Sequence, residues 1–174
     1  MIDVKESFAQ DMELYEEIRV LRSNIAEEKF SCSKATRKKA MDFLSRREYS
    51  QLELINKLIA KGYSREVVEE VVICLTSEGL QSNDRFVESF VNSRINQGKG
   101  PIRIRLDLME RGIRDADIER AISESEVDWH DLAKKVRLRK FGSKKPEELK
   151  AKAKQIRFLR YRGFDQDHIQ LALK

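Results

Sequence analysis

Leu58-Ile59-Ala60-Lys61-Gly62-Tyr63 is a phrase that recurs about every fifty residues, as Leu108-Met109-Glu110-Arg111-Gly112-Ile113 and as Leu159-Arg160-Tyr161-Arg162-Gly163-Phe164. Each copy places a large apolar residue directly after a glycine. Two further apolar residues follow at matching offsets, as Val68 and Val72, Ile118 and Ile122, and Ile169 and Leu173. Self-similarity at a fixed period indicates one supersecondary unit used several times. Arrays of this kind usually present an extended interaction surface rather than a single catalytic pocket.

The residues between these phrases are typical of helices. The chain has 174 residues, of which 40% are hydrophobic and 37% charged, with only seven glycines and two prolines. So few glycines and prolines leave little material for hairpins or phosphate-binding loops. Leu, Ile, Val, Glu, Lys and Arg recur instead at helical spacing, which predicts an all-α fold.

The repeat divides the chain into an N-terminal extension and three units of three helices each. We place the extension at residues 1–33 and the units at 34–80, 81–125 and 126–174. The extension is acidic and is expected to form an amphipathic helix over 5–29, with Phe8, Met12, Tyr15, Ile18, Leu21 and Ile25 on one face. Ser31-Cys32-Ser33 is expected to break this helix and to start the next one.

Start and stop signals define the helices inside each unit. Ser50, with Glu53 three residues later, predicts a capped start for a helix over 51–61, and Gly62 predicts a left-handed residue at its end. Pro101 follows the loop Gly98-Lys99-Gly100 at the first helical position, which proline favours. Pro146 is expected to open the matching helix of the third unit. That helix would bury Leu149, Ala153, Ile156 and Leu159.

Charge is unevenly distributed along the chain. The formal net charge is +5, but residues 131–162 hold thirteen Lys or Arg and three Asp or Glu, which leaves 22 basic and 27 acidic residues elsewhere. Such asymmetry indicates an electrostatic partner for the basic part, either a nucleic acid or an acidic protein surface. The alternative is that these side chains only form a solvated helical face.

Two patterns of basic residues are candidate partner-binding sites. Arg47, Arg94 and Lys140 fall at matching positions near the ends of the three opening helices, either as a row of cations or because a cation is favourable at a helix C-terminus. In the helix expected at 146–162, Lys150, Lys154 and Arg157 share one face with few acids within helical reach. Lys144 and Lys145 add to the same region, whereas Phe158 and Tyr161 are expected to be packed rather than to stack on bases.

The sequence offers no catalytic constellation. It contains no GxxxxGK[ST], GxSxG or HExxH motif, and Cys32, Cys74, His130 and His168 are isolated from one another in sequence. We therefore expect no enzyme, no cofactor and no metal. The free thiols, and the lack of a long apolar segment or signal peptide, predict a cytoplasmic protein without a membrane contact.

Three stretches of the chain resemble the repeats of the bacterial RecX family. The central signature is carried by Asp84-Arg85-Phe86-Val87, Phe90-Val91-Asn92-Ser93-Arg94, Gly98-Lys99-Gly100-Pro101-Ile102-Arg103-Ile104-Arg105 and Arg111-Gly112-Ile113. The stretch Leu44-Ser45-Arg46-Arg47-Glu48-Tyr49-Ser50, followed by Leu54, Leu58 and Lys61-Gly62-Tyr63, is similar to the first repeat. Residues Lys154 to Phe164 are similar to the third. The resemblance covers residues 34–174 and leaves the acidic helix unexplained.

The resemblance implies both a fold and a function. It implies three tandem three-helix repeats in an elongated, curved monomer. RecX proteins bind the RecA filament on single-stranded DNA and restrain its growth, ATP hydrolysis, strand exchange and co-protease activity. Arg94, Arg103 and Arg105 flank the Gly98–Pro101 loop and are the expected central contacts, unless they only form surface pairs such as Arg103 with Asp107.

A second class of function stays open on the residues alone. The chain could be a free-standing nucleic-acid-binding module, similar to a helix-turn-helix regulator, whose protein partner is incidental. Independent DNA affinity with sequence preference would favour that class. Inhibition of RecA well below one molecule per protomer would favour the RecA regulator.

Overall fold

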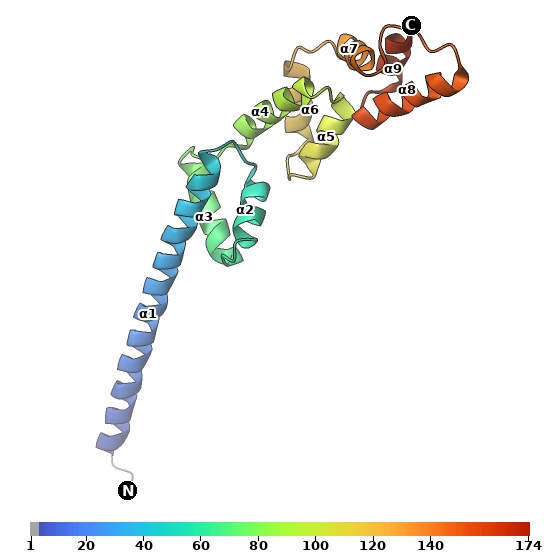
Figure 1. Ribbon diagram of the computed structural model, residues 1–174. Coiled ribbons are helices and arrows are strands. Elements are labelled where there is room, and N and C mark those ends of the chain that lie inside the picture. Colours follow the sequence, from blue (N-terminus) through green and yellow to red (C-terminus); the bar gives the residue numbers. More distant parts are fainter. Residues whose placement is uncertain (1–3) are drawn as a thin grey trace. The chain divides into compact units, whose positions relative to one another are not determined.

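The computed structural model describes the backbone of residues 4–174 and the side chains of residues 17–25 and 32–174. Over this range the chain forms nine α-helices and no strand, which confirms the all-α fold (Figure 1). The helices are α1 Val4–Leu44, α2 Gln51–Ile59, α3 Arg65–Ser77, α4 Asn83–Asn96, α5 Pro101–Met109, α6 Asp115–Glu124, α7 Trp129–Phe141, α8 Leu149–Arg162 and α9 Gln166–Leu173.

The chain divides into two compact units. The first comprises the residues up to Arg46 together with Leu54–Leu80, and the second comprises Arg47–Glu53 together with Gln81–Lys174. The second unit therefore contains the three-helix groups α4–α6 and α7–α9 and the connection that leads into α2. The elongated and curved form implied by the resemblance stays a prediction.

The expected break at Ser31-Cys32-Ser33 is wrong, because α1 is one helix of 41 residues. Residues 4–44 contain neither glycine nor proline, and serine costs a helix interior only a few tenths of a kcal/mol, about 0.5 relative to alanine. The hydroxyl of Thr36 donates to the carbonyl oxygen of Cys32 at 2.8 Å, so the helix absorbs this polar group locally. The extension and the opening helix of the first repeat are one element.

The apolar residues of the N-terminal part of α1 do not form a buried face where they are described. Ile18, Leu21 and Ile25 are 41%, 58% and 63% exposed. The expected partners Phe8, Met12 and Tyr15 lie outside the described side chains. The amphipathic pattern therefore predicts the helix correctly, but the described members of its apolar face are exposed.

The first unit has a small core between α1, α2 and α3. Ala40 of α1 is fully buried, as are Leu54 and Leu58 of α2 and Val68 and Leu75 of α3. Arg37 and Glu78 form a bidentate ion pair at the surface of the same unit. The apolar offsets after Gly62 thus mark inward-facing positions of α3, as the repeat predicts.

The second unit has two separate apolar cores. The first is formed by α4, α5 and α6 and includes the fully buried Ile104, Leu108 and Ile118. The second is formed by α7, α8 and α9, with Ala133, Leu159, Phe164 and Ile169 at its centre. Each three-helix group therefore buries its own apolar faces, as a tandem repeat requires.

The helix ends agree with most of the sequence signals. Gly62, Gly112 and Gly163 have φ values of +91°, +74° and +90°, the left-handed conformation that glycine adopts without strain. Pro101 is at the first position of α5, and Ser82 accepts a hydrogen bond from the Arg85 N–H at the start of α4.

The start of α8 differs from the expectation. The helix begins at Leu149, three residues after Pro146, with Glu148 extended before it. The guanidinium of Arg137, which is 4% exposed, donates to the carbonyl oxygen of Lys144 at 3.2 Å and ties this loop to α7. Leu149 is consequently 86% exposed, and the buried positions of α8 are Gln155 and Leu159.

Candidate binding surface

The loop Gly98-Lys99-Gly100 connects α4 to α5 in the second repeat and contacts the end of α8 in the third repeat. The backbone N–H groups of Gly100 and Ile102 donate to the carbonyl oxygens of Arg162 and Gly163, at 2.8 and 3.1 Å. The free N–H groups at the start of α5 thereby satisfy the free carbonyls at the end of α8. This end-to-end contact fixes the position of Lys99 beside the last turn of α8.

Two glycines make this backbone approach possible. A Cβ atom on Gly100 would lie 2.4 Å from the carbonyl oxygen of Gly163, and one on Gly163 would lie 2.4 Å from the backbone nitrogen of Arg103. Both distances are far inside van der Waals contact, so neither position accepts a side chain in this arrangement. Gly100 of the central signature and Gly163 of the third repeat therefore allow the two repeats to pack together.

Asp107 gathers the cations expected around that loop. Asp107 is 5% exposed, and its carboxylate pairs with Arg94 Nε at 3.2 Å and with Arg103 Nε at 2.8 Å. The guanidinium of Arg94 also lies 4.5 Å from the centre of the Phe90 ring. The structure therefore contains the local Arg103–Asp107 pair, which the sequence offered as the alternative to a contact with a partner.

The other candidate arginines are also paired within the chain. Arg105 binds Asp115 and Glu119, each at 2.6 Å. Arg47 pairs with Glu53 at 3.1 Å and lies 3.6 Å from the centre of the Tyr49 ring. These guanidinium groups are about half exposed, and a partner would have to share them with carboxylates of the protein.

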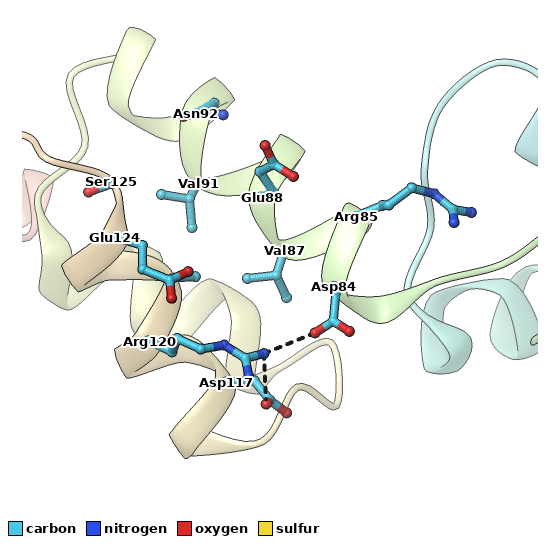
Figure 2. Close-up of a pocket in the computed structure, with 11 residues that line it drawn as sticks. Asp84, Arg85, Val87, Glu88, Val91, Asn92, Asp117, Arg120, Glu124 and Ser125 are labelled. Carbon is cyan, nitrogen blue, oxygen red and sulfur yellow. Dashed lines mark hydrogen bonds and ion pairs between the residues drawn. The ribbon is translucent and has the colours of Figure 1, made fainter. Parts of the chain in front are cut away.

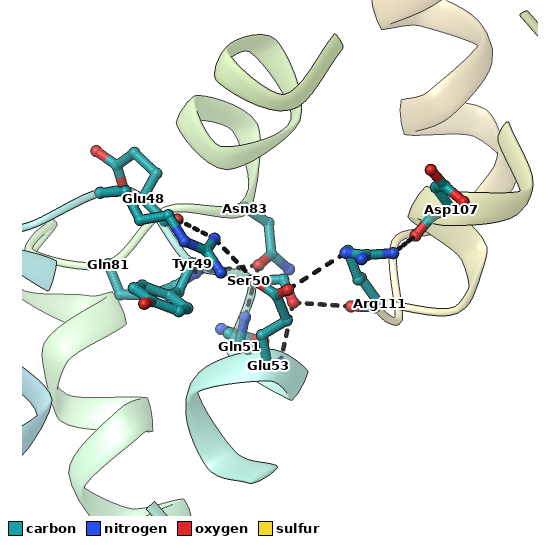
Figure 3. A network of polar contacts seen from close by, with 10 residues as sticks. Glu48, Tyr49, Ser50, Gln51, Glu53, Gln81, Asn83, Asp107 and Arg111 are labelled. Atoms are coloured by element: carbon teal, nitrogen blue, oxygen red, sulfur yellow. Dashed lines mark hydrogen bonds and ion pairs between the residues drawn. The ribbon is translucent and has the colours of Figure 1, made fainter. Parts of the chain in front are cut away.

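A polar network surrounds Glu53 in the second unit (Figure 3). The Glu53 N–H donates to Ser50 Oγ at 3.1 Å, which confirms Ser50 as the cap of α2. The carboxylate of Glu53 does not close a capping box but pairs with Arg47 and with Arg111, the latter at 3.2 Å. The Ser50 hydroxyl donates in turn to the carbonyl oxygen of Arg111 at 2.8 Å. This network ties residues 47–53 to the end of α5.

The cations of the third repeat have a different environment. Lys150, Lys154 and Arg157 are exposed, and none of them forms an ion pair with the residues that the structure describes. Lys140 and Lys145 are exposed as well, whereas Lys144 reaches Glu147 at 3.6 Å. Their charge is therefore largely available to a partner.

The structure separates the two aromatic residues of α8. Phe158 is partly buried and meets the Phe141 ring edge-on at 5.3 Å, as expected for a packed side chain. Tyr161 is 76% exposed, so the expectation that it is packed is wrong. It follows Lys150, Lys154 and Arg157 at helical spacing, and this spacing was the signal in the sequence that could have identified its exposure.

Lys99 lies close to this ring and to other cations. Its Nζ is 5.9 Å from the centre of the Tyr161 ring. Partial burial, followed by repulsion from Arg162, Arg103 and Arg94, lowers the pKa of Lys99, while Asp107 opposes the shift. The last turn of α8 therefore concentrates positive charge around an exposed aromatic ring.

A small cationic pocket opens beside the same turn. It has a volume of about 140 Å³ and is lined by Gln97, Val136, Arg139, Lys140, Phe158 and Arg162. Arg162 is fixed there, because its guanidinium donates to the carbonyl oxygen of Gln97 at 2.7 Å and lies 5.2 Å from the centre of the Phe158 ring. Three of the lining residues are cations, Val136 and Phe158 are apolar, and none is a carboxylate.

A larger groove of opposite character lies between α4 and α6 (Figure 2). Its volume is about 640 Å³, and Val87 and Val91 form part of its wall. Arg120 bridges Asp84 and Asp117 across it, at 3.0 and 3.2 Å. Glu88 and Glu124 lie on its rim, so the groove is predominantly acidic.

His, Cys, Asp and Glu are the common metal ligands, and the described side chains include many of them. No group of three or more His, Cys, Asp or Glu gathers among them in a way that could hold a metal ion. Cys32 and Cys74 are free thiols, and the rings of His130 and His168 meet edge-on at 4.7 Å. Within the described residues, the helices are all too short or too polar to cross a membrane.

Comparison with known proteins connects this geometry to a family. Residues 37–73, 82–122 and 126–173 match the first, second and third three-helix domains of RecX. The regulatory protein RecX of Pseudomonas putida strain GB-1 is 47% identical over 135 residues, which covers 78% of this chain and 86% of that protein. RecX of Pseudomonas fluorescens strain Pf-5 is 43% identical over 139 residues, covering 80% and 90%.

Solved structures agree with this assignment. A crystal structure of regulatory protein RecX has a TM-score of 0.73 at 25% identity and covers 87% of this chain and 76% of its own. RecX from Lactobacillus salivarius has a TM-score of 0.67 at 21% identity, covering 82% and 94%, and shows the same fold. Because all three repeat domains match in order and close relatives span most of the sequence, the chain belongs to the RecX family of regulatory proteins.

Proposed function

We propose that this protein binds the RecA filament on single-stranded DNA and restrains filament growth, ATP hydrolysis, strand exchange and co-protease activity. The observation that carries the proposal is the ordered match of all three repeats to the three RecX domains. The protein would act in the cytoplasm as a monomer and by binding alone, without catalysis or a cofactor.

The charge distribution supports an encounter with a nucleoprotein filament. A filament carries the negative field of its DNA, and a cationic face accelerates association with such a field. Lys140, Lys145, Lys150, Lys154 and Arg157 are the strongest candidates for partner contacts, because the described residues supply no carboxylate to them. Lys144 belongs to the same surface.

The arginines near the central signature would contribute in a different way. Arg47, Arg94, Arg103 and Arg105 already hold carboxylates of the protein. A partner would gain less from them, since each exposed pair must be shared or exchanged. We therefore assign them a secondary role in the contact with the filament.

The test is DNA-dependent ATP hydrolysis by RecA of the same organism, titrated with this protein. An inhibitor that stops a filament end or clamps a turn silences many subunits, so half-inhibition is expected well below one molecule per RecA protomer. A heat-denatured sample of the protein serves as the control. Full RecA activity at equimolar protein would contradict the proposal.

A free-standing nucleic-acid-binding module is the second candidate. The observation that favours it is the exposure of Tyr161 among unpaired cations, since aromatic rings and cations together bind single strands. The two functions separate in one comparison. A sequence-specific DNA complex together with unchanged RecA activity would support the module over the RecA regulator.

A further inference from the structure

The last two turns of α8 carry a cationic and aromatic surface whose members belong to one rigid corner of the second unit. Tyr161 and Arg162 are consecutive, and Arg162 is held by the carbonyl oxygen of Gln97. Lys99 reaches the ring of Tyr161 from the α4–α5 loop, whose two hydrogen bonds to α8 fix it there. The arrangement is built from backbone contacts between two repeats rather than from mobile side chains alone.

The cations of this corner are kept together against their mutual repulsion. Arg139, Lys140 and Arg162 line the pocket of about 140 Å³ without a carboxylate in its lining. Burial lowers the pKa of Lys99, and repulsion from Arg162, Arg103 and Arg94 lowers it further, while Asp107 acts in the opposite direction. A negatively charged group in this place would relieve that repulsion, and a phosphate is small enough for the pocket.

The cationic surface continues along the exposed face of α8. Lys150, Lys154, Arg157 and Tyr161 are spaced by four, three and four residues and all are exposed. At 1.5 Å per residue these positions extend for about 16 Å along the helix. A row of cations that ends in an exposed ring offers several phosphate contacts followed by one stacking surface.

From these observations we propose that Lys99, Arg139, Lys140, Arg162 and the exposed face of α8 form a binding site for single-stranded nucleic acid, in which the cations hold phosphates and Tyr161 stacks on an unpaired base. The site deepens the proposed function, because it would contact the DNA strand inside the filament directly. An exposed ring beside a row of cations suits a single strand, because the cations meet its phosphates and every base offers a face for stacking. In a duplex those faces are occupied by neighbouring base pairs.

The test measures binding of the full-length protein to fluorescein-labelled oligothymidine by fluorescence anisotropy, without RecA. Tyr161→Ala is expected to weaken binding roughly 5- to 150-fold, the range for loss of one base–aromatic stack. Tyr161→Phe keeps the ring and is expected to bind like the wild type. Since the Tyr161 ring is exposed, circular dichroism should show unchanged helicity for both variants.

A charge variant tests the phosphate contacts separately. Lys140→Ala is expected to reduce the slope of log affinity against log salt by about 0.7, the value for one lost phosphate contact on a single strand. Lys61→Ala, an exposed lysine of the first repeat, is the matched control and should leave the slope unchanged.

The outcomes are decisive in both directions. Selective loss with Tyr161→Ala, together with weaker binding of the corresponding duplex, supports the site. Equal affinity of Tyr161→Ala and wild type, equal binding of duplex and single strand, or no measurable affinity at low salt would each overturn it. Because RecA is absent, a failure of RecA inhibition leaves this result standing, and the reverse also holds.

Discussion

At the scale of single residues, Asp107 decides how much positive charge the second repeat offers to a partner. The sequence places Arg94, Arg103 and Arg105 around one loop, and their spacing alone is compatible with a shared partner. In the structure a buried carboxylate takes up the charge of Arg94 and Arg103. Helical spacing could suggest the Arg103–Asp107 pair, but the contact with Arg94 depends on the packing of α4 against α5.

Replacing Asp107 with Asn is expected to destabilise the second unit. The change leaves two guanidinium groups without their shared carboxylate, and depriving partly buried charged groups of their partner costs about 1–3 kcal/mol. Urea unfolding followed by circular dichroism measures the loss. Asp115→Asn is the matched control, since Asp115 is exposed in its pair with Arg105, and exposed pairs contribute about 1 kcal/mol or less. Equal losses in the two variants would contradict a special role of Asp107.

His168 is a second residue whose role depends on tertiary structure. It is 8% exposed, its ring meets His130 edge-on, and its Nδ1 lies 3.0 Å from a carboxylate oxygen of Asp165. Burial lowers the pKa of His168, and His130 lowers it further, while Asp165, Asp167 and Asp128 act in the opposite direction. The sequence shows two isolated histidines and does not reveal this environment.

Stability of the second unit should therefore fall in mildly acidic solution. With a depressed pKa in the folded state, the unfolded chain binds the proton more readily, so unfolding is favoured as the pH falls through about 6.5, the ordinary histidine value. Thermal unfolding between pH 7.5 and pH 5.5 should show a decrease in Tm. His168→Gln should flatten this decrease, and an identical pH profile in the variant would contradict the assignment.

At the scale of elements, the sequence predicts helices well where glycine, proline or an N-cap ends them and less well where none does. Gly62, Gly112 and Gly163 end their helices as expected, because the left-handed conformation favours glycine. The serines at 31 and 33 do not interrupt α1, because serine is only a weak helix breaker. The start of α8 was not predicted because the buried Arg137 holds the preceding loop through the Lys144 carbonyl oxygen, and the helical pattern of the sequence carries no signal for this contact.

The contact between α5 and α8 makes a specific steric prediction. Gly100 has an ordinary φ of −84°, so Gly100→Ala adds no backbone strain and tests only the 2.4 Å clash with Gly163. Forcing a methyl group into a packed position costs about 1–3 kcal/mol, and we expect a loss of stability in this range. Gly142→Ala is the control, since its φ is +79° but nothing lies within 4 Å of a new Cβ.

The two glycine variants should differ in kind as well as in size. Gly142→Ala carries only the cost of a backbone conformation that is essentially confined to glycine (φ +79°, ψ −176°), about 1–3 kcal/mol, and should leave the α5–α8 contact intact. Gly100→Ala should in addition speed hydrogen exchange at the Ile102 amide, which donates to Gly163. Unchanged protection of this amide in Gly100→Ala would show that the contact tolerates a side chain.

At the scale of the whole molecule, the uneven charge of the sequence has a structural counterpart. The candidate arginines of residues 47–53, α4 and α5 are paired with carboxylates, whereas the cations of α8 have no carboxylate partner among the described residues. Composition alone gives the excess of charge in residues 131–162 but not which cations are neutralised, because that depends on contacts between helices. The repeat and the charge asymmetry were therefore predictable, and the separation into paired and unpaired cations was not.

This separation predicts which cations control binding to the RecA–DNA filament. Replacing Lys150, Lys154 and Arg157 with Glu should weaken binding and flatten its salt dependence, because each lost phosphate contact removes about 0.7 from the salt slope on a single strand.

The control variant replaces Lys34, Lys38 and Lys61, exposed lysines of the first unit, with Glu and lowers the net charge equally, from +5 to −1. Sedimentation or anisotropy on preformed filaments at several salt concentrations measures both variants. If net charge alone drives recruitment, the two variants lose affinity equally and the α8 face has no special role. A selective loss in the α8 variant would place the contact on that helix.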